Sequence, residues 1–509
     1  MHASSQASFG PVYLVGAGPG DPRLLSIRAA ECLARAHVIL CECSVDPRAL
    51  ESASPSSEVV WIDDPRAEGT RRALEEVVAR LIATSRAGKT AVHLIAGDPE
   101  LFSTGFEEAE ALHRAGVPVE VVPGVTAATA AAAMAEIPIT HAALSSAVAM
   151  VTTRQPSDSR VRPVDFFHLG RFPGTLVVYA PDCEPQRWTR RLIEGGSSPD
   201  TPVVVVSDAA RPHQRVWRCA LGELAAQMVE RCGGAQSVAV VGPVAALAPA
   251  VGWYAARPLF GRRVLLTRPR NQAAEMLARL RDLGADVTLQ PAIEIGPPAN
   301  WQPVDKAIER LDRYHWLVFS SVNGVDFLLG RLEERGHDLR RLAGLKLAAI
   351  GPATAERLQH HRLTVATTPP QYRAESLAET LAGHAAGKRF LLARASRGRE
   401  VLAERLRDAG AEVDQIVVYT SRDVTQPEPA TAETLRAGGF DWVTVTSSAI
   451  ARALHTMYGP ALAHSRLASI SPITSRTLRE LGYDPAVEAK EYTTEGLVDA
   501  MVQFQQRCV

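Results

Sequence analysis

The segment GRRVLLTRPRNQAAEMLARLRDLGADV, residues 261–287, has a second copy, GKRFLLARASRGREVLAERLRDAGAEV, at residues 387–413. Each copy begins with a short apolar run and continues with apolar residues at helical spacing, a pattern that indicates a strand followed by a helix. The two copies start 126 residues apart. A repeat over this distance predicts two similar α/β lobes in the second half of the chain.

Two more blocks repeat in the same order. The segment WLVFSSVNGVDFLL at 316–329 matches WVTVTSSAIARAL at 442–454, again 126 residues on. The segment AAIGPATAERL at 348–358 matches ASISPITSRTL at 468–478, 120 residues on. Because three matched blocks in one order seldom arise by chance, the duplication decides the fold class of this half.

Hydroxyl-bearing residues and glycine follow the apolar run in each copy of the second and third blocks. These positions are the carboxyl ends of parallel strands, where open α/β sheets bind ligands. They are also helix N-termini, which attract anions. Helix capping is the alternative explanation, but four such turns across two lobes favour an anion-binding cleft. The candidate substrate-binding residues of these turns are Ser320, Ser321, Asn323, Gly351, Thr354, Thr446, Ser447, Ser448, Ser471 and Thr474.

The composition limits the kind of protein. A chain of 509 residues with 46% hydrophobic residues exceeds what one core usually organises, so more than one domain is expected. The formal net charge of −1 gives no global attraction to nucleic acid or to an anionic membrane. The sequence lacks an apolar run long enough to span a membrane, and its start has no signal-peptide pattern, so a cytoplasmic protein is expected. Seven scattered cysteines predict neither a disulfide framework nor a metal site.

The first half also alternates apolar runs with helical patterns, as in VYLVGAG, PRLLSIRAAECLARA and HVILCE. This alternation predicts α/β units with mainly parallel sheets. Pro, Gly and Ala interrupt the periodicity just before VLLTRP, which places the main boundary near Trp253 to Gly261. We therefore expect one domain over 10–250, a linker over 251–260 and a second domain over 261–509.

Six segments of the second domain resemble the uroporphyrinogen-III synthase family: VLLTRP, VFSSVNGV, AAIGPATAERL, QIVVYTSR, FDWVTVTSSAI and ISPITSRTLRELGYDP. The resemblance covers Phe260 to Val509. It implies an enzyme without a cofactor that closes hydroxymethylbilane, a linear tetrapyrrole, into a ring while inverting the last pyrrole. The task of the protein is then to fold a flexible octa-carboxylate and to assist departure of a hydroxyl.

The same resemblance implies roles for single residues. Tyr419 matches the family tyrosine that assists hydroxyl departure, although a tyrosine packed at a strand end is the alternative. Arg268 and Arg394, equivalent in the repeat, are candidates for charge-assisted contacts to substrate carboxylates, and a surface location is the alternative for both. Two linkers running side by side predict a hinge between lobe one (260–293 and 422–509) and lobe two (297–416).

The first half begins with a strand and a glycine turn, which alone suggests a dinucleotide fold, but Pro19 and Asp21 interrupt that fingerprint. Together with AGDPELFSTGFEEAEAL, VEVVPGVTAATAAAAMAEIPITH, GTLVVYAP and TPVVVVSDAARPHQRVW, this start resembles the tetrapyrrole methyltransferase family over roughly 10–250. The resemblance implies two α/β halves with S-adenosyl-L-methionine between them. The implied cofactor-binding residues are Pro19, Gly97, Asp98, Leu101, Thr126, Ala127, Ala180 and Ala209. For Asp98, a turn-forming role before Pro99 is the alternative.

The first half departs from the family pattern on the side of the tetrapyrrole. Glu42 and Cys43 stand where an Asp-Arg pair is usual, and Thr104 stands where an Arg is usual. Residues 63–65 (Asp-Asp-Pro) replace a Gly-Lys-Arg stretch, and residues 95–98 read Ile-Ala-Gly-Asp instead of Lys-Gly-Gly-Asp. Glu42 can replace the family's Asp as a general base.

Three interpretations of the first half stay open: a uroporphyrinogen-III methyltransferase, a methylase for a related tetrapyrrole, or a degenerate scaffold. The fusion favours the first, because the product of one half would be the substrate of the other, on the way to sirohaem and cobalamin. A two-lobed sugar- or anion-binding module is the alternative from another class, and the missing signal sequence argues against it. Tetrapyrroles are the expected partners, with a homodimer through the methylase half.

Overall fold

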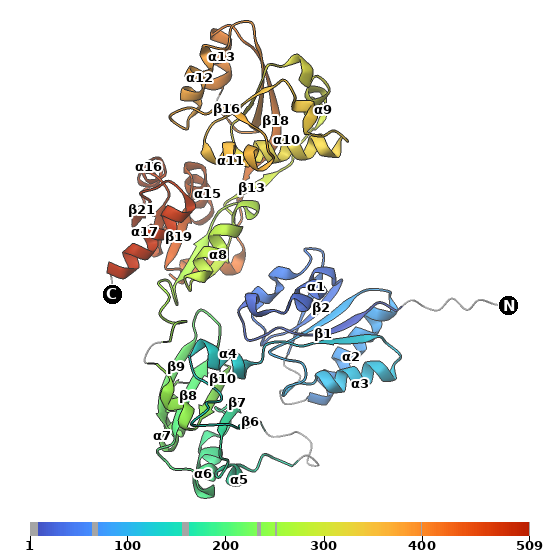
Figure 1. Cartoon of the computed structure of the whole chain (residues 1–509), viewed down its shortest axis with the longest axis vertical. Helices are drawn as coiled ribbons and strands as arrows, with labels where there is room; N and C mark the ends of the chain where they lie inside the picture. Colours follow the sequence, from blue (N-terminus) through green and yellow to red (C-terminus); the bar gives the residue numbers. More distant parts are fainter. Residues whose placement is uncertain are drawn as a thin grey trace, which may run out of the picture. The chain divides into compact units, whose positions relative to one another are not determined.

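The computed structural model describes residues 9–63, 70–154, 162–231, 236–249, 252–398 and 400–507. The chain divides into two compact units (Figure 1). The first comprises Met1–Gly261 with Asp282–Asp286, and the second comprises Arg262–Arg281 with Val287–Val509. Among the described residues, no helix is both long and apolar enough to cross a membrane.

The first sheet of the first unit is entirely parallel. Its strands are, in spatial order, β3 (Glu58–Ile62), β2 (Val38–Glu42), β4 (Ala91–Ile95), β1 (Val12–Gly16) and β5 (Val119–Val122). Its helices are α1 (Ile27–Arg35), α2 (Thr70–Arg86) and α3 (Gly105–Arg114). Val92 and Leu94 of β4 pack in the core under α1, and Ala91 and Ile95 pack under α2 and α3. Helices therefore cover both faces, as expected of a buried parallel sheet.

The second sheet of this unit is mixed. Its strands are, in spatial order, β6 (Val148–Thr152), β7 (Thr175–Tyr179), β10 (Ser237–Val241), β8 (Pro202–Ser207) and β9 (Arg215–Ala220). Its helices are α4 (Ala127–Met134), α5 (Phe166–Leu169), α6 (Pro185–Gly195) and α7 (Leu221–Arg231). Only β6 and β7 pair in parallel, and the other three pairs are antiparallel. The prediction of mainly parallel sheets holds for the chain, and this sheet is the exception to it. Between β8 and β9 the short connection permits a hairpin and no crossover.

The second unit contains two lobes built from equivalent elements. The lobe-one sheet has the order β12 (Asp286–Leu289), β11 (Arg263–Leu266), β19 (Trp442–Val445), β20 (Arg466–Ser469) and β21 (Val487–Glu488). The lobe-two sheet has the order β13 (Ile293–Gly296), β18 (Glu412–Asp423), β17 (Arg389–Ala395), β14 (Trp316–Phe319), β15 (Lys346–Ala349) and β16 (Val365–Thr367). Strands β11, β19 and β20 match β17, β14 and β15. The predicted duplicated α/β fold is confirmed.

Helices flank both sheets at matching points of the repeat. Lobe one contains α8 (Ala274–Asp282), α14 (Pro429–Arg436), α15 (Ser448–Tyr458), α16 (Pro472–Glu480) and α17 (Thr494–Arg507). Lobe two contains α9 (Gln302–Glu309), α10 (Val322–Glu334), α11 (Pro352–His360), α12 (Ala374–Ala382) and α13 (Val401–Asp408). In β14, Leu317 and Phe319 pack in the core under α10, and Trp316 and Val318 pack under α12 and α13.

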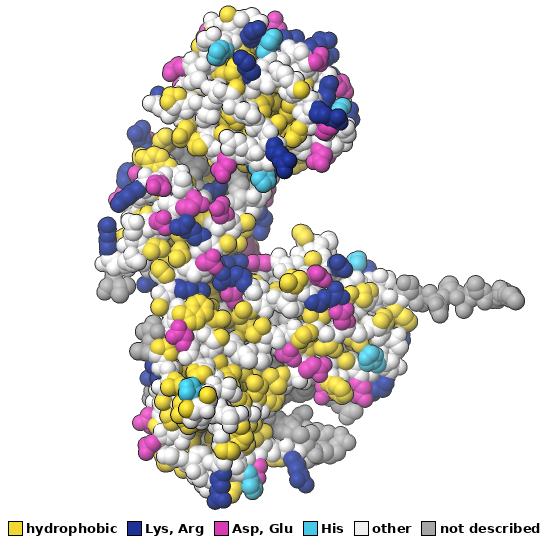
Figure 2. Space-filling view, in the orientation of Figure 1, with side chains coloured by type: hydrophobic (Ala, Val, Ile, Leu, Met, Phe, Trp, Pro, Cys, Tyr) yellow, Lys and Arg dark blue, Asp and Glu magenta, His cyan; other side chains and the backbone are white. Residues whose placement is uncertain are grey.

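Two strands side by side connect the lobes. The first part of β18 runs parallel to β17, and its last part pairs antiparallel with β13, from Ile293 opposite Asp423 to Gly296 opposite Thr420. This is the predicted two-stranded linker. On the face seen in Figure 2, basic and acidic side chains are intermixed, in keeping with the net charge of −1.

Candidate functional site

The first unit contains a cavity of about 420 Å³ between the strand ends of its two sheets. Its wall includes all eight candidate cofactor-binding residues, which come from five separate segments of the chain. The wall further includes Phe102, Tyr179 and Gln236, which were not among the candidates. A cavity of this size, lined by both apolar and polar side chains, is large enough for a small-molecule ligand.

Close backbone contacts between glycines shape one side of this cavity. Gly18 and Gly97 exchange two backbone hydrogen bonds, of 3.1 and 3.0 Å, and both have positive φ angles. A Cβ atom on Gly124 would lie 2.1 Å from the Gly97 carbonyl oxygen, and one on Gly16 would lie 2.6 Å from the Gly124 Cα. No larger residue fits at Gly16 or Gly124, so the glycine turn is explained by close packing.

Three other wall residues have a left-handed backbone. Phe102, Ala180 and Asp208 have φ angles of 53°, 50° and 50°. Such a conformation costs a non-glycine residue about 1–3 kcal/mol and clusters at ligand sites. The strained backbone of these three residues therefore favours a ligand site over a chance gap between the two halves of the domain.

Asp98 connects two loops of the wall. Its carboxylate accepts hydrogen bonds from the Glu100 N–H, at 2.9 Å, and from the Gly124 N–H, at 3.0 Å. The bond to Glu100 forms the turn around Pro99. The bond to Gly124 holds the loop of Gly124 against Gly97. Each carboxylate oxygen retains acceptor capacity toward the cavity.

In the second unit, Tyr419 lies near the end of the shared strand β18 and is buried, with 7% of its surface exposed. The Ser321 hydroxyl donates to the Tyr419 hydroxyl oxygen at 2.9 Å and accepts from the Gly324 N–H at 3.0 Å. The ring of Tyr419 stacks on Phe327, with centroids 5.9 Å apart. Ser321 is thus both a helix cap and the partner of the phenol, which leaves the phenol hydrogen available to a ligand.

The other predicted turns cap helices to different degrees. Ser447 accepts from the Ile450 N–H at 3.1 Å, and Ser471 accepts from the Thr474 N–H at 3.4 Å. Gly351 provides no side-chain cap for α11. The capping explanation therefore accounts for Ser321, Ser447 and Ser471.

The remaining candidates at these turns vary in their contacts. Asn323 is buried and accepts from the Gln272 amide at 2.9 Å, and Ser448 accepts from Thr477 at 2.8 Å. Ser320 donates weakly to the Ala393 carbonyl at 3.5 Å. Thr354 and Thr474 are buried and Thr446 is half-buried.

Arg268 and Arg394 are equivalent in the repeat but differ in their surroundings. Arg394 forms an ion pair with Glu400, donates to Gln415 at 2.7 Å and donates to the Gly398 carbonyl at 3.1 Å. Arg268 makes one long contact, 3.4 Å to Gln272, and among the described residues its buried Nε has no hydrogen-bond partner. Burial lowers the pKa of Arg268 below the usual value.

The sequence carries the signal for this difference. The positions equivalent to Glu400 and Gln415 in the first copy are Ala274 and Leu289, which offer no acceptor. Arg268 is thus buried with an unbonded Nε among the described residues, although the charges of Glu495 and Glu275 partly offset the effect of burial on its pKa. An anionic ligand would complete its hydrogen bonding.

Comparison with known proteins identifies both halves. Residues 11–225 match the family Tetrapyrrole (Corrin/Porphyrin) Methylases, and residues 274–499 match the family Uroporphyrinogen-III synthase HemD. The porphyrin biosynthesis protein HemD of Ruminiclostridium josui is 28% identical over 492 residues, which cover 96% of this chain and 95% of that protein. The uroporphyrinogen-III C-methyltransferase of Bacillus subtilis is 30% identical over 362 residues, covering 71% of this chain and 74% of that protein.

The chain belongs to the tetrapyrrole methylases, fused to a uroporphyrinogen-III synthase domain. The methylase domain alone is 35% identical over 245 residues to the S-adenosyl-L-methionine-dependent uroporphyrinogen III methyltransferase of Methanosarcina barkeri. That match covers 48% of this chain and 96% of the relative. The predicted family membership of both halves is confirmed.

Glu42 of the methylase domain lies behind the cavity wall. It is 1% exposed and accepts hydrogen bonds from the Ala96 N–H, at 3.0 Å, and from the Ser44 hydroxyl, at 3.1 Å. Its neighbours Cys43 and Ser44 belong to the wall, and Glu42 itself does not. A role as general base stays a prediction and requires the wall to open or a proton to pass through Ser44.

Thr104 of the methylase domain takes part in a buried network. Its hydroxyl donates to Glu108 at 2.7 Å, and the other oxygen of Glu108 pairs with His93 at 2.7 Å. Burial lowers the pKa of His93, but the Glu108 carboxylate more than offsets this, so the pKa is raised. Of the altered residues 63–65, only Asp63 lies within the described part of the chain.

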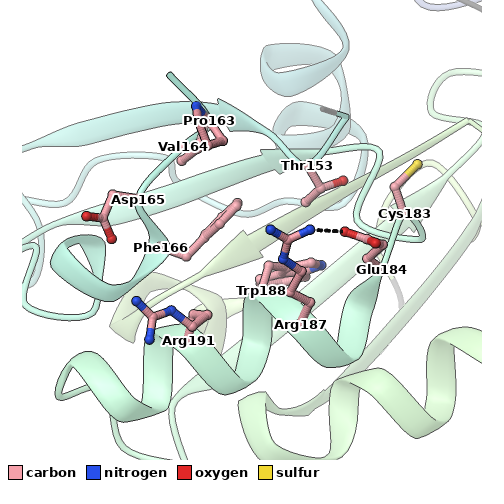
Figure 3. Close-up of a pocket in the computed structure, with 10 residues that line it drawn as sticks. All are labelled: Thr153, Pro163, Val164, Asp165, Phe166, Cys183, Glu184, Arg187, Trp188 and Arg191. Atoms are coloured by element: carbon pink, nitrogen blue, oxygen red, sulfur yellow. Dashed lines mark hydrogen bonds and ion pairs between the residues drawn. The ribbon is translucent and has the colours of Figure 1, made fainter. Parts of the chain in front are cut away.

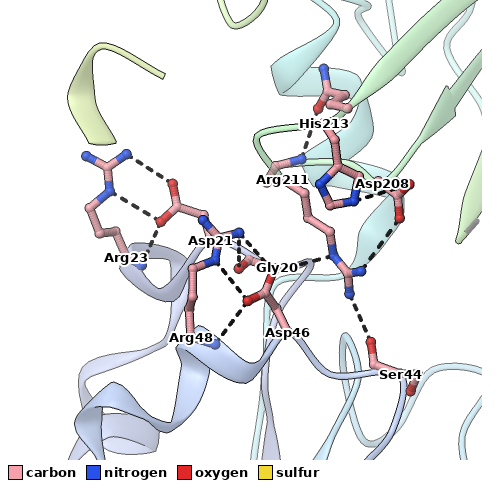
Figure 4. A network of polar contacts seen from close by, with 11 residues as sticks. Gly20, Asp21, Arg23, Ser44, Asp46, Arg48, Asp208, Arg211 and His213 are labelled. Atoms are coloured by element: carbon pink, nitrogen blue, oxygen red, sulfur yellow. Dashed lines mark hydrogen bonds and ion pairs between the residues drawn. The ribbon is translucent and has the colours of Figure 1, made fainter. Parts of the chain in front are cut away.

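Sequence reasoning missed two basic residues of the methylase cavity, Arg154 and Arg211. Arg211 donates to the Ser44 carbonyl at 2.9 Å and lies 3.6 Å from Asp208 and 3.8 Å from Asp46 (Figure 4). It thereby connects the two α/β halves of this domain. Its position in the segment SDAARP, two residues after Ala209, was the available signal.

Among the described residues, cavities without a candidate residue include the following two. One, of about 280 Å³, lies beside α6 and has Phe166, Trp188 and the Arg187–Glu184 ion pair in its wall (Figure 3). The other, of about 1000 Å³, lies along the linker strands of the synthase domain and includes Arg270 and Arg422. Within the described ranges, no group of three or more His, Cys, Asp or Glu residues is arranged to hold a metal ion.

Proposed function

We propose that the synthase domain closes hydroxymethylbilane to uroporphyrinogen III, with Tyr419 assisting the departure of the terminal hydroxyl. The observation that carries this proposal is the Ser321–Tyr419 contact of 2.9 Å, in which the phenol oxygen accepts and its hydrogen remains available. Tyr419 sits where lobe two meets the linker strands. A substrate that contacts both lobes would pass this point.

The chemistry then needs little from the protein besides positioning and one proton. The terminal pyrrole supplies the electron pair that breaks the C–O bond, and the Tyr419 phenol donates its proton to the leaving oxygen, so water departs. The pyrrole N–H proton lost in forming the azafulvene returns to the phenolate. The far ring attacks the resulting azafulvene to give a spiro intermediate, which fragments and recloses with the last ring inverted. The strand-end turns hold the carboxylates in the required fold. Closure of the two lobes on the substrate stays a prediction.

Arg268 supplies the positive charge for this task. Its buried, incompletely bonded guanidinium matches a substrate carboxylate, whereas Arg394 is satisfied by Glu400 and Gln415. The hydroxyl-rich turns share the other carboxylates. The eight carboxylates of the substrate are therefore met without a large basic patch.

Replacement of Arg268 by Ala is expected to raise the KM for hydroxymethylbilane by about 10-fold or more, because a charge-assisted hydrogen bond is lost. The matched variant Arg394→Ala should change KM by less than about twofold, since a ligand gains nothing from a guanidinium that is already bonded. The KM of each variant is obtained from initial rates of isomer III formation by the full chain. Equal effects of the two substitutions would contradict the assignment of Arg268.

We further propose that the methylase domain binds S-adenosyl-L-methionine in the 420 Å³ cavity and methylates uroporphyrinogen III. Two features of the cavity support this proposal: the eight clustered candidate residues and the left-handed backbone of three wall residues. The Methanosarcina barkeri relative is named as an S-adenosyl-L-methionine-dependent enzyme. Small residues at Gly97, Ala180 and Ala209 permit close backbone contact with an adenosine, and Asp98 can accept from ribose hydroxyls or the amino group. When bound, the donor supplies the methyl group. Titration calorimetry with the donor tests this binding.

A second candidate for the methylase domain is methylation of a related tetrapyrrole. The observation that favours it is the loss of basic residues at Cys43 and Thr104. Arg154 and Arg211 stand on the same wall, but Arg211 already pairs with Asp208 and Asp46 and therefore does not fully replace the lost basic residues. Transfer of a labelled methyl group to uroporphyrinogen III would favour uroporphyrinogen III as the acceptor over a related tetrapyrrole. The homodimer through the methylase domain stays a prediction that sedimentation can test.

A further inference from the structure

Two tyrosines of the synthase domain occupy equivalent exposed positions. Tyr372 lies in PPQYRAESLAETL, residues 369–381, and Tyr492 lies in AKEYTTEGLVDAM, residues 489–501. They are 120 residues apart, the distance that relates the third repeated block. Their exposed fractions are 66% and 64%, which is high for large aromatic side chains.

The backbone holds both rings in the same way. The Arg373 N–H donates to the Gln371 carbonyl at 2.7 Å, and the Thr493 N–H donates to the Glu491 carbonyl at 2.7 Å. Each tyrosine is thus the central residue of a three-residue turn. Both turns lead directly into a helix, α12 or α17, whose next core residue is fully buried. The rings are therefore exposed on an anchored backbone.

The turn of Tyr372 lies beside a predicted substrate-binding residue. A Cβ atom on Gly351, the N-cap of α11, would lie 3.4 Å from the Cβ and 3.6 Å from the Cγ of Tyr372. In the repeat, Ser471 and Tyr492 correspond to Gly351 and Tyr372. Each ring therefore belongs to the strand-end edge of its own lobe, where the hydroxyl-rich turns also lie.

The flanking residues differ between the copies while the tyrosine is the same. Gln371 corresponds to Glu491, and Arg373 corresponds to Thr493. Packing does not require an aromatic residue at a position that is two-thirds exposed. A flat ring held at a ligand-binding edge suits a flat partner, because aromatic rings attract one another in stacked or edge-to-face arrangements. The substrate of the proposed synthase reaction carries four pyrrole rings.

We propose that Tyr372 and Tyr492 are positioning residues that each bind a pyrrole ring of the linear tetrapyrrole by aromatic contact. One ring is held by each lobe, so the substrate is bent when the lobes act together. The carboxylates are held by the adjacent turns, and the rings by the tyrosines. This inference rests on the proposed synthase function and specifies which residues bind the pyrrole rings of the substrate.

The test uses the full chain, hydroxymethylbilane, and the variants Tyr372→Ala and Tyr492→Ala. Each is expected to raise KM by about 3- to 10-fold, the range of one aromatic contact. The double variant should combine both effects and release more of the uninverted isomer, since unbound substrate cyclises without inversion. Tyr372→Phe and Tyr492→Phe should keep KM within about twofold, because the ring is retained.

Controls make each outcome decisive. Val417→Ala removes an exposed apolar side chain elsewhere in the domain and should leave KM unchanged. Should an Ala variant fail to fold, Tyr→Leu at the same position keeps apolar bulk but loses the ring, and the same rise in KM is expected. An unchanged KM in the Ala or Leu variants, or an equal rise in the Phe variants, overturns the proposal. Failure of the unsubstituted chain to form isomer III would instead refute the synthase function itself.

Discussion

Tyr419→Phe is expected to lower kcat for uroporphyrinogen III formation by about 10²-fold or more, the usual contribution of a general acid. The substitution removes only the phenol oxygen and hydrogen. The ring still stacks on Phe327, and Ser321 still caps α10 through the Gly324 N–H. KM and thermal stability should therefore change little, because neither packing nor carboxylate binding depends on the hydroxyl.

A matched control exists in the same lobe. Tyr314 donates its hydroxyl to Asp414 at 2.6 Å, away from the strand-end turns. Tyr314→Phe removes the same atoms and should leave kcat unchanged. Stopped assays that separate the two uroporphyrinogen isomers measure both variants. If Tyr419→Phe retained the full rate, the protein would act by conformation alone, and the general-acid role would be wrong.

Ala209→Phe is expected to weaken binding of S-adenosyl-L-methionine by at least about 100-fold, because a phenyl ring would project from the wall into the 420 Å³ cavity and obstruct the donor. Ala209 is 7% exposed and belongs to the cavity wall. Ala209→Val, which adds two methyl groups, should give an intermediate loss. Calorimetric titration of the full chain with the donor measures the affinities.

The synthase reaction provides an internal control for this variant. Since the two activities lie in separate units, isomer III formation should be unchanged in Ala209→Phe. Leu247→Phe, at a position that is 46% exposed in the methylase domain, should leave donor binding intact. Undiminished donor affinity in Ala209→Phe would place the donor outside this cavity.

The fold could be predicted from the sequence where the signal was periodic or repeated. The matched blocks located equivalent strands in the two lobes, since apolar runs and helical spacing directly reflect buried faces. The antiparallel pairs of β7, β8, β9 and β10 were missed, because an apolar strand looks the same in either direction. Only the length of the connection between β8 and β9 carried that information.

The site was predictable where a residue's role follows from its own segment. Gly18 and Gly97 fall into this class, because their positive φ angles favour glycine. Arg211 was missed, because its partners Ser44 and Asp46 are far away in the chain and only the fold brings them together. Arg268 and Arg394 looked alike until the positions of Glu400 and Gln415 were compared across the repeat.

We propose that one chain makes uroporphyrinogen III and then methylates it. The most direct measurement incubates the full chain with hydroxymethylbilane and S-adenosyl-L-methionine carrying a labelled methyl group, and then separates the products by isomer and by label. We expect isomer III as the cyclised product, and label in the methylated tetrapyrrole derived from it. Formation of the uninverted isomer alone, at the rate seen without protein, would refute the synthase function.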